Sequence, residues 1–119
     1  MKANFNVQLV LDSYLETLLW CSGEEGEFDG ITIYDFGEDA VNSSKNDIEK
    51  FIETINLFPA AIAEANEYNE RMLGHNFALS RNGHGAGFFD DNNDRLQYIC
   101  RETKSAEPYL GDDNKVYIM

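Results

Sequence analysis

Apolar residues gather around a central turn signal in the stretch from Gly74 to Asp91, GHNFALSRNGHGAGFFDD. Two short apolar runs, Asn76 to Ser80 and Ala86 to Phe89, flank Asn82-Gly83. An Asn-Gly pair between apolar runs is a strong hairpin signal, because both residues tolerate the positive φ of a type I′ turn. The pattern therefore predicts a β-hairpin over about residues 75–90, with its turn at Asn82-Gly83.

The first predicted helix lies near the N-terminus. Either Asp12 or Ser13 can cap its start, and Gly23 ends it. Trp20 is expected to anchor this helix in the core. Residues 4–10, just before it, alternate loosely and predict a short strand or an extended lead-in.

The most strongly periodic segment lies in the middle of the chain. Its apolar residues recur at the spacing of one helical face: Ile48, Phe51, Ile52 and Ile55. Three polar residues can cap its start: Ser43, Ser44 and Asn46. Pro59 predicts either a kink or a restart with proline in the first turn of a second helix. That second helix is expected to run from Ala60 to Asn69 and to stop before Gly74.

The C-terminal third predicts one more helix and two short strands. The helix has an inward face formed by Leu96, Ile99, Cys100 and Thr103. Residues 109–110 and 116–118 predict strands that either form a second hairpin or add to the first. We therefore expect a single α+β domain over residues 1–119: a small antiparallel β-sheet built on the 75–90 hairpin and covered by about three helices.

The net charge of the chain limits the kinds of molecule that it can bind. The chain has 22 acidic and 9 basic residues, for a net charge of −13, which opposes binding to nucleic acid or to an anionic membrane and favours a basic partner. Residues 24–53, which we call the acidic belt, hold ten carboxylates against two lysines, a net charge of −8. The predicted partner-binding residues in the belt are Glu24, Glu25, Glu27, Asp29, Asp35, Glu38 and Asp39. The alternative is a solvated acidic face that only keeps the protein soluble.

Candidate chemistry is sparse. A catalytic interpretation would use His84 as general base, oriented by Asp90 or Asp91, and a metal interpretation would add His75. Neither set has a recognised ligand or nucleophile spacing, so no catalytic residue, metal or cofactor is predicted. Cys21 and Cys100 are expected to be reduced thiols rather than a disulfide. Arg81 and Arg95 are rare cations in this chain. They are expected to pair with nearby carboxylates such as Asp90, Asp91 or Asp94.

The segment from Leu79 to Asp90, LSRNGHGAGFFD, resembles the motif of a family of small uncharacterised proteins encoded by bacteriophages and related mobile elements. The segments 14–20, 74–77 and 109–117 are similar to further parts of that family, in the same order along the chain. This chain departs from the family pattern at Ala78, where an aromatic residue is usual, and over residues 33–69. The motif positions are Arg81, Asn82, Gly83, His84, Gly85, Gly87 and Asp90. The resemblance implies a phage-type origin and assigns no catalytic residue.

These observations together favour a non-catalytic acidic protein that binds a host protein with a basic surface and inhibits or modulates it. A field of carboxylates can imitate the phosphates of DNA, so a DNA-handling or defence protein is the expected target, in the cytoplasm of the host cell. The alternative is a small enzyme or ligand-binding protein that uses His84 and nearby carboxylates. A third alternative is an accessory protein that works as a homo-oligomer.

Overall fold

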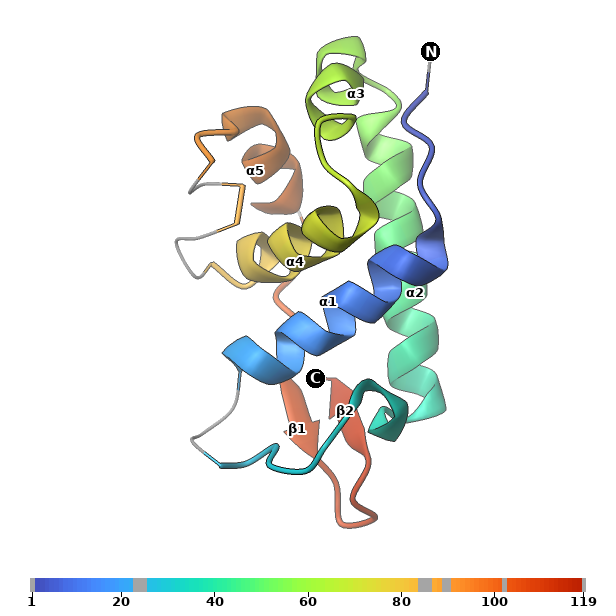
Figure 1. The fold of residues 1–119 in the computed structure, drawn as a ribbon, viewed down its shortest axis with the longest axis vertical. Coiled ribbons are helices and arrows are strands. Elements are labelled where there is room, and N and C mark those ends of the chain that lie inside the picture. The colour runs from blue at the N-terminus through green and yellow to red at the C-terminus, as the bar shows by residue number, and fades with distance from the viewer. Residues whose placement is uncertain (1, 23–25, 84–86, 89–90, 102, 119) are drawn as a thin grey trace.

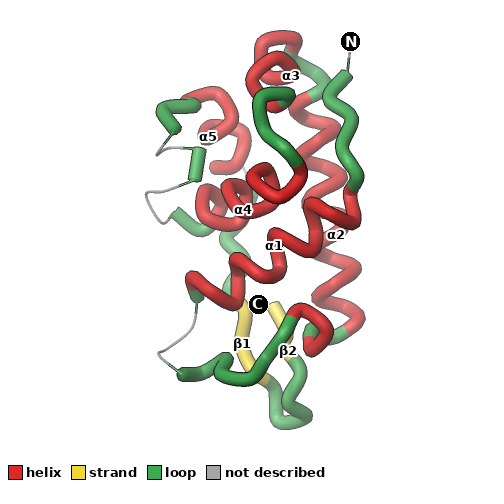
Figure 2. Tube along the Cα trace, viewed as in Figure 1, coloured by secondary structure: helices red, strands yellow, loops and turns green. Residues whose placement is uncertain are grey.

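The computed structural model describes residues 2–22, 26–83, 87–88, 91–101 and 103–118. Helices make up most of this described chain, and two short strands form its one sheet (Figures 1 and 2). The predicted α+β fold, a sheet covered by helices, is therefore wrong. The elements in chain order are α1 (Val7–Cys21), the 3₁₀ helix η1 (Ile33–Asp35), α2 (Glu38–Ile55), α3 (Pro59–Ala65), α4 (Glu70–Arg81), α5 (Asp94–Arg101), β1 (Pro108–Leu110) and β2 (Val116–Ile118).

The hairpin predicted over residues 75–90 is also wrong, because its first half lies in α4. The helix begins where the side-chain oxygen of Asn69 accepts a hydrogen bond of 2.8 Å from the Met72 N–H. Leu73 and Phe77, four positions apart, are both fully buried, as one helical face requires. The apolar run that resembles a strand is thus the inward face of a helix.

The Asn82-Gly83 turn exists, but it ends a helix instead of joining two strands. Asn82 follows α4 with φ −91°, and Gly83 has φ +70°. A left-handed glycine just past the last helical residue is a common way to end a helix. The Asn-Gly dipeptide is therefore compatible with both a hairpin turn and a helix end. The helix forms here because its apolar face is buried in the core. Of the predicted second apolar run, Ala86 to Phe89, the structure describes only Gly87 and Phe88, which form a turn; Ala86 and Phe89 lie outside the described residues.

Gly74 lets α1 and α4 cross in close contact, whereas it was expected to stop a helix. A Cβ built at Gly74 would lie 2.3 Å from the carbonyl oxygen of Val10 and 3.0 Å from the Tyr14 nitrogen. The α1 backbone thus rests directly on α4 at this glycine, which has no side chain to separate the two helices. In Figure 1, α1 passes in front of α2 and runs alongside α4.

Stacked aromatic rings join the helices in the core. Phe51 of α2 stacks on Phe77 of α4 with ring centroids 4.4 Å apart, and Tyr14 of α1 meets Phe77 at 5.4 Å. Phe88 belongs to the segment between α4 and α5, which we call the glycine-rich loop. The centroid of its ring lies 6.0 Å from that of Phe51 and 5.3 Å from that of Tyr68. Such offset and edge-on contacts add to the stabilisation from apolar burial. The loop after α4 therefore contributes a core residue of its own.

The predicted helical face around residues 48–55 is confirmed in α2, where these apolar residues are buried or half-buried. The helix begins at Glu38, more than a turn before the predicted caps at residues 43–46. Ala40 and Ser44 continue the same buried face toward the N-terminus, so packing extends the helix through a polar-looking sequence. Gly37 precedes its first turn and makes no side-chain cap.

Pro59 restarts the helix as predicted, because it occupies the first turn of α3. The expected helix over residues 60–69 is too long, since α3 ends at Ala65. Asn69, expected within that helix, instead caps α4. Two short helices with a turn between them therefore replace one longer helix.

The N-terminal prediction fails in three places. The cap of α1 is Asn6 and not Asp12 or Ser13, which lie inside the helix. Asn6 accepts hydrogen bonds from the backbone of the next turn, so residues 7–10 are helix rather than strand or extended chain. Trp20 is 73% exposed and is not a core anchor. Leu11, Tyr14 and Leu18 form the inward face of α1, and Trp20 lies off that face.

The C-terminal elements agree with the prediction except at Thr103. Leu96, Ile99 and Cys100 are buried on α5, but Thr103, predicted on the same face, lies past the end of this helix. Strands β1 and β2 pair with each other as an antiparallel hairpin, with Tyr109 opposite Tyr117. Within the described chain, no helix combines the length and apolar character needed to cross a membrane.

Candidate functional sites

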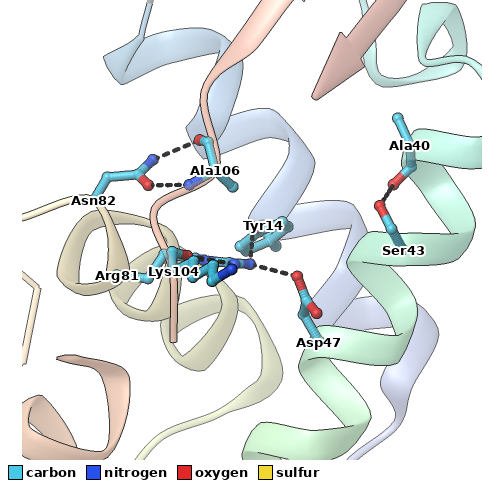
Figure 3. Close-up of polar contacts among 8 residues, drawn as sticks. All are labelled: Tyr14, Ala40, Ser43, Asp47, Arg81, Asn82, Lys104 and Ala106. Atoms are coloured by element: carbon cyan, nitrogen blue, oxygen red, sulfur yellow. Dashed lines mark hydrogen bonds and ion pairs between the residues drawn. The ribbon is translucent and has the colours of Figure 1, made fainter. Parts of the chain in front are cut away.

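Arg81 is the last residue of α4, and its guanidinium is buried where three other parts of the chain meet (Figure 3). Nη1 donates to the Tyr14 hydroxyl at 2.7 Å and to Asp47 Oδ2 at 2.9 Å. Nε and Nη2 both donate to the Lys104 carbonyl, at 2.9 and 2.6 Å. This one side chain therefore ties α4 to α1, to α2 and to the segment before the C-terminal hairpin.

Asn82 holds the same segment two residues further on. Its Oδ1 accepts from the Ala106 N–H at 2.7 Å, and its Nδ2 donates to the Ala106 carbonyl at 3.0 Å (Figure 3). A reciprocal pair of hydrogen bonds fixes both the position and the direction of the backbone it binds. Arg81 and Asn82 thus form a two-residue clamp on residues 104–106.

Aromatic rings surround the buried cation. The Arg81 Cζ lies 5.3 Å from the centroid of the Phe77 ring and 5.9 Å from that of Tyr14. Contact with ring faces compensates part of the hydration that a buried guanidinium loses. Burial raises the pKa of Tyr14 to about 12, although the charge of Arg81 acts in the opposite direction. Tyr14 is therefore neutral at physiological pH and serves as a hydrogen-bond acceptor.

The described part of the glycine-rich loop lies directly on α4. Ser80 Oγ accepts a hydrogen bond of 3.0 Å from the Phe88 N–H. Gly87 has φ +71°, and a Cβ there would lie 2.7 Å from both the Asn76 carbonyl oxygen and Ser80 Oγ. No residue with a side chain fits this position without displacing the helix or the loop.

The structure gives three motif residues, Arg81, Asn82 and Gly87, roles in internal packing, whereas the fourth described one, Gly83, is exposed and supplies the positive φ after the end of α4. The other three, His84, Gly85 and Asp90, lie outside the described residues. Sequence reasoning missed the clamp because its partners are distant in the chain. The only local signal is the Arg-Asn pair at a helix end.

The two arginines pair with other carboxylates than those expected from sequence proximity. The ion-pair partner of Arg81 is Asp47 at 2.9 Å, and that of Arg95 is Glu64. Asp91, expected to orient His84 or to pair with an arginine, instead accepts hydrogen bonds from the Tyr68 hydroxyl and the Asn76 amide. Burial and the hydrogen bond to Asp91 raise the pKa of Tyr68 to about 12.

His75 of α4 contacts two residues of α1. Its Nδ1 lies 3.0 Å from the Thr17 hydroxyl, and its ring lies 5.9 Å from that of Trp20. Within residues 2–22, 26–83, 87–88, 91–101 and 103–118, no group of three or more His, Cys, Asp or Glu side chains could hold a metal ion.

The belt residues predicted to bind a partner occupy different environments. Asp35 accepts from the Thr32 N–H at 2.8 Å and completes the capping box of η1, so its carboxylate serves the fold. Asp29 is exposed, as are Glu38 and Asp39 in the first turn of α2, whereas Glu27 is half-buried. Glu24 and Glu25 lie outside the described residues.

Folding brings the C-terminal hairpin beside the start of α2. The Gly37 N–H donates to the Val116 carbonyl at 2.8 Å, and a Cβ at Gly37 would touch the Tyr117 ring. The Tyr117 hydroxyl donates to Asp113 Oδ2 at 2.6 Å, and this bond is the main reason why the pKa of Tyr117 is raised; the charge of Asp39 contributes as well. We call the group Glu38, Asp39, Asp112 and Asp113 the acidic end.

Exposed tyrosines accompany the acidic end. Tyr34, in η1 just before α2, is 89% exposed, and Tyr109 on β1 is 41% exposed. The Tyr109 ring lies 5.9 Å from that of Tyr117. Hydrogen bonds from the Tyr117 hydroxyl and the Lys115 N–H hold the pKa of Asp113 below its usual value, so this carboxylate is charged at neutral pH.

A groove of about 920 Å³ lies on another part of the surface, between α2, α5 and residues 103–106. Phe51, Ile99 and Ala106 are among its buried lining residues, and Phe58 and Tyr98 are half-exposed or more at its margin. Arg81 and Asp47 also line the groove. The clamp at the end of α4 therefore forms part of its wall.

No family model matches this chain, and neither curated proteins nor solved structures include a match.

Proposed function

We propose that this chain is a non-catalytic binding protein whose acidic end recognises a basic surface on another protein and thereby inhibits or modulates it. The observation that carries the proposal is the hydrogen bond from the Gly37 N–H to the Val116 carbonyl, which holds the hairpin that carries Asp112 and Asp113 beside the start of α2, where Glu38 and Asp39 lie. Carboxylates from two parts of the chain that lie close together give a more concentrated field than either part alone. Such a field steers a cationic partner into contact.

The tyrosines beside the acidic end support a protein partner in particular. Tyr34 and Tyr109 expose apolar ring surface together with a hydroxyl. Tyrosine is enriched at protein interfaces and among the residues that contribute most to binding. A surface that combines carboxylates with exposed tyrosines thus offers both long-range attraction and contact area.

The chemistry of the described interior supports a binding role over catalysis. The polar groups of Arg81 and Asn82 are used in hydrogen bonds within the fold. Burial raises the pKa values of Tyr14 and Cys100, which keeps both groups protonated and poorly nucleophilic at neutral pH. These side chains stabilise the structure and are unsuited to proton or acyl transfer.

The partner we propose is a DNA-handling or defence protein of a bacterial host, met in the host cytoplasm. A protein that binds DNA presents a basic groove to phosphates, and an acidic surface can occupy that groove. The resemblance of residues 79–90 to phage-type proteins supports a host target. The net charge of −13 supports a partner of opposite charge.

The test uses two variants of equal net charge as baits in a bacterial lysate. The first carries Glu38→Gln, Asp39→Asn and Asp112→Asn at the acidic end. The control carries three neutralised exposed carboxylates elsewhere: Glu16→Gln, Glu53→Gln and Glu67→Gln. Captured proteins are identified by mass spectrometry, and binding of each purified partner is then measured at increasing salt.

We expect the wild type and the control to capture the same basic protein, and the acidic-end variant to lose it. The association rate should fall as salt rises, because steering by exposed charge is screened. A labelled DNA duplex should compete for the same partner. Equal capture by all three baits would show that the acidic end serves only solubility.

A further inference from the structure

The groove between α2 and α5 is long as well as apolar. Its α2 wall runs from Ser43 to Thr54, and eleven helical steps correspond to about 16 Å. Residues of α5 and of the 103–106 segment form the facing wall. The groove is therefore about as long as three turns of a helix.

The apolar residues that line the groove are of two kinds, buried and exposed. Phe51 and Ile99 are buried at 3% and 8% exposure, whereas Phe58 and Tyr98 expose 50% and 65% of their surface. Exposed aromatic and apolar side chains around a groove mark a surface suited to binding another molecule. A ligand here can bury ring surface that water now contacts.

The charge of the groove is opposite to that of the whole chain. Four of the nine Lys and Arg residues line it, against a single carboxylate, Asp47. Arg81 is neutralised by Asp47, and Arg95 by Glu64. Among the described residues, the ammonium groups of Lys50 and Lys104 have no carboxylate within ion-pair distance. Two cations on facing elements are thus available to an anionic ligand.

We propose that this groove binds an amphipathic helix of a partner protein that carries acidic residues beside its apolar stripe. A helix places apolar side chains at positions i, i+3, i+4 and i+7 along one face, which matches a groove of three turns. Carboxylates flanking that stripe would reach Lys50 on one wall and Lys104 on the other. The carboxylates of the acidic end lie in the first turn of α2 and in the hairpin turn, outside the residues that line the groove, so this inference does not rest on the proposed function.

The probe is a fluorescein-labelled helical peptide of fourteen residues, with Leu and Phe at the stripe positions and Glu beside them. A matched peptide has Lys in place of every Glu. Binding is measured by fluorescence anisotropy, and the binding surface is mapped from amide chemical shifts of the isotope-labelled protein. We expect the acidic peptide to bind at least about tenfold tighter than the basic one, despite the net charge of −13.

The matched protein variants are Lys50→Glu and Lys45→Glu. Both lysines are exposed on α2, and both substitutions change the net charge equally, but only Lys50 lines the groove. Lys50→Glu should weaken binding of the acidic peptide by about fivefold or more, and Lys45→Glu by less than about twofold. Tyr98→Ala should weaken both peptides through lost apolar contact.

Four outcomes would overturn the proposal. They are equal effects of the two lysine variants, tighter binding of the basic peptide, shifts that fall away from Thr54, Phe58 and Tyr98, and the same shifts produced by free glutamate alone. A dimer in light scattering that occupies the groove would assign the site to a second copy of this chain. None of these variants changes a residue of the acidic end. The groove proposal can therefore fail while the proposed function of the acidic end holds, and the reverse is also possible.

Discussion

The Arg81 guanidinium donates a hydrogen bond of 2.9 Å to the Asp47 carboxylate, and 34 positions separate these two residues in the sequence. The arginine side chain is 5% exposed, while the aspartate is 36% exposed. A buried cation therefore contacts an anion at the surface, next to the Tyr14 hydroxyl and the Lys104 carbonyl. Arg81, the first residue of the Arg-Asn pair in the motif, is thus the joint that connects α4 to α1 and α2.

Replacing Arg81 should destabilise the fold far more than replacing Arg95. Arg81→Met leaves the Tyr14 hydroxyl and the Lys104 carbonyl without their donor, and we expect a loss of about 3 kcal/mol in the free energy of unfolding. Arg95 is about half exposed in its pair with Glu64, so Arg95→Met should cost less than about 1 kcal/mol. Urea denaturation of both variants measures the difference. Equal losses would contradict the assignment of Arg81 as the joint.

The protein should lose stability above pH 10 in part through Tyr14. Its pKa is raised to about 12 in the fold, so the folded state holds this proton more tightly than the unfolded state does. The resulting stabilisation is complete below the unfolded pKa near 10 and is lost as pH rises toward 12. Urea midpoints from pH 7 to pH 11.5 measure this loss.

Tyr14→Phe is the control for the alkaline effect. It removes the acceptor of an Arg81 hydrogen bond, which should cost about 1 kcal/mol at pH 7. The decline of stability above pH 10 should be shallower than in the wild type, with a residual slope from Tyr68, whose pKa is also about 12. If the two proteins decline in parallel, Tyr14 does not contribute to the alkaline loss.

The two thiols should react at different rates with a disulfide reagent. Cys100 is fully buried on α5, and burial raises the pKa of its thiol. Cys21 is only partly buried at the end of α1, although burial raises the pKa of its thiol as well. We expect Cys21 to react first and Cys100 only at the rate of unfolding. Cys21→Ser should abolish the fast phase, and a fast phase that persists would contradict this order.

Local sequence patterns predicted the elements that depend on neighbours in the chain. The buried face of α2, the restart at Pro59, the α5 face and the C-terminal hairpin all follow from spacing within a few residues. The predictions were wrong where contacts between residues distant in the sequence determine the local structure. Gly74 continues its helix because α1 rests on it, and Asn82-Gly83 ends a helix because Leu73 and Phe77 face the core.

The clamp could not be predicted from local sequence for the same reason. The partners of Arg81 lie 67, 34 and 23 positions away, and nothing near them in the sequence marks the contact. The acidic end combines predicted belt residues with Asp112 and Asp113, which belong to a turn and carry no pattern of their own. Composition predicted the charge, and the fold adds that the hairpin carrying Asp112 and Asp113 lies beside the start of α2.

Gly83 and Gly87 provide a matched pair that separates backbone strain from steric contact. Both have positive φ, +70° and +71°, so alanine at either position costs about 1 kcal/mol in backbone strain. At Gly83, no described atom lies within 4 Å of the added Cβ. At Gly87, the Cβ would lie 2.7 Å from the Asn76 carbonyl oxygen and would force the loop off α4.

We therefore expect Gly87→Ala to lower the free energy of unfolding by at least about 1 kcal/mol more than Gly83→Ala does. Displacing the loop also removes the Phe88 N–H from Ser80 Oγ and moves the Phe88 ring away from Phe51. Thermal melts of both variants, together with near-ultraviolet circular dichroism of the aromatic core, measure the two effects. Gly83→Ala serves as the control because it shares the strain without the contact. If both variants lose the same stability and keep the same aromatic signal, the loop does not pack on α4 as described, and the motif glycines act through backbone conformation alone.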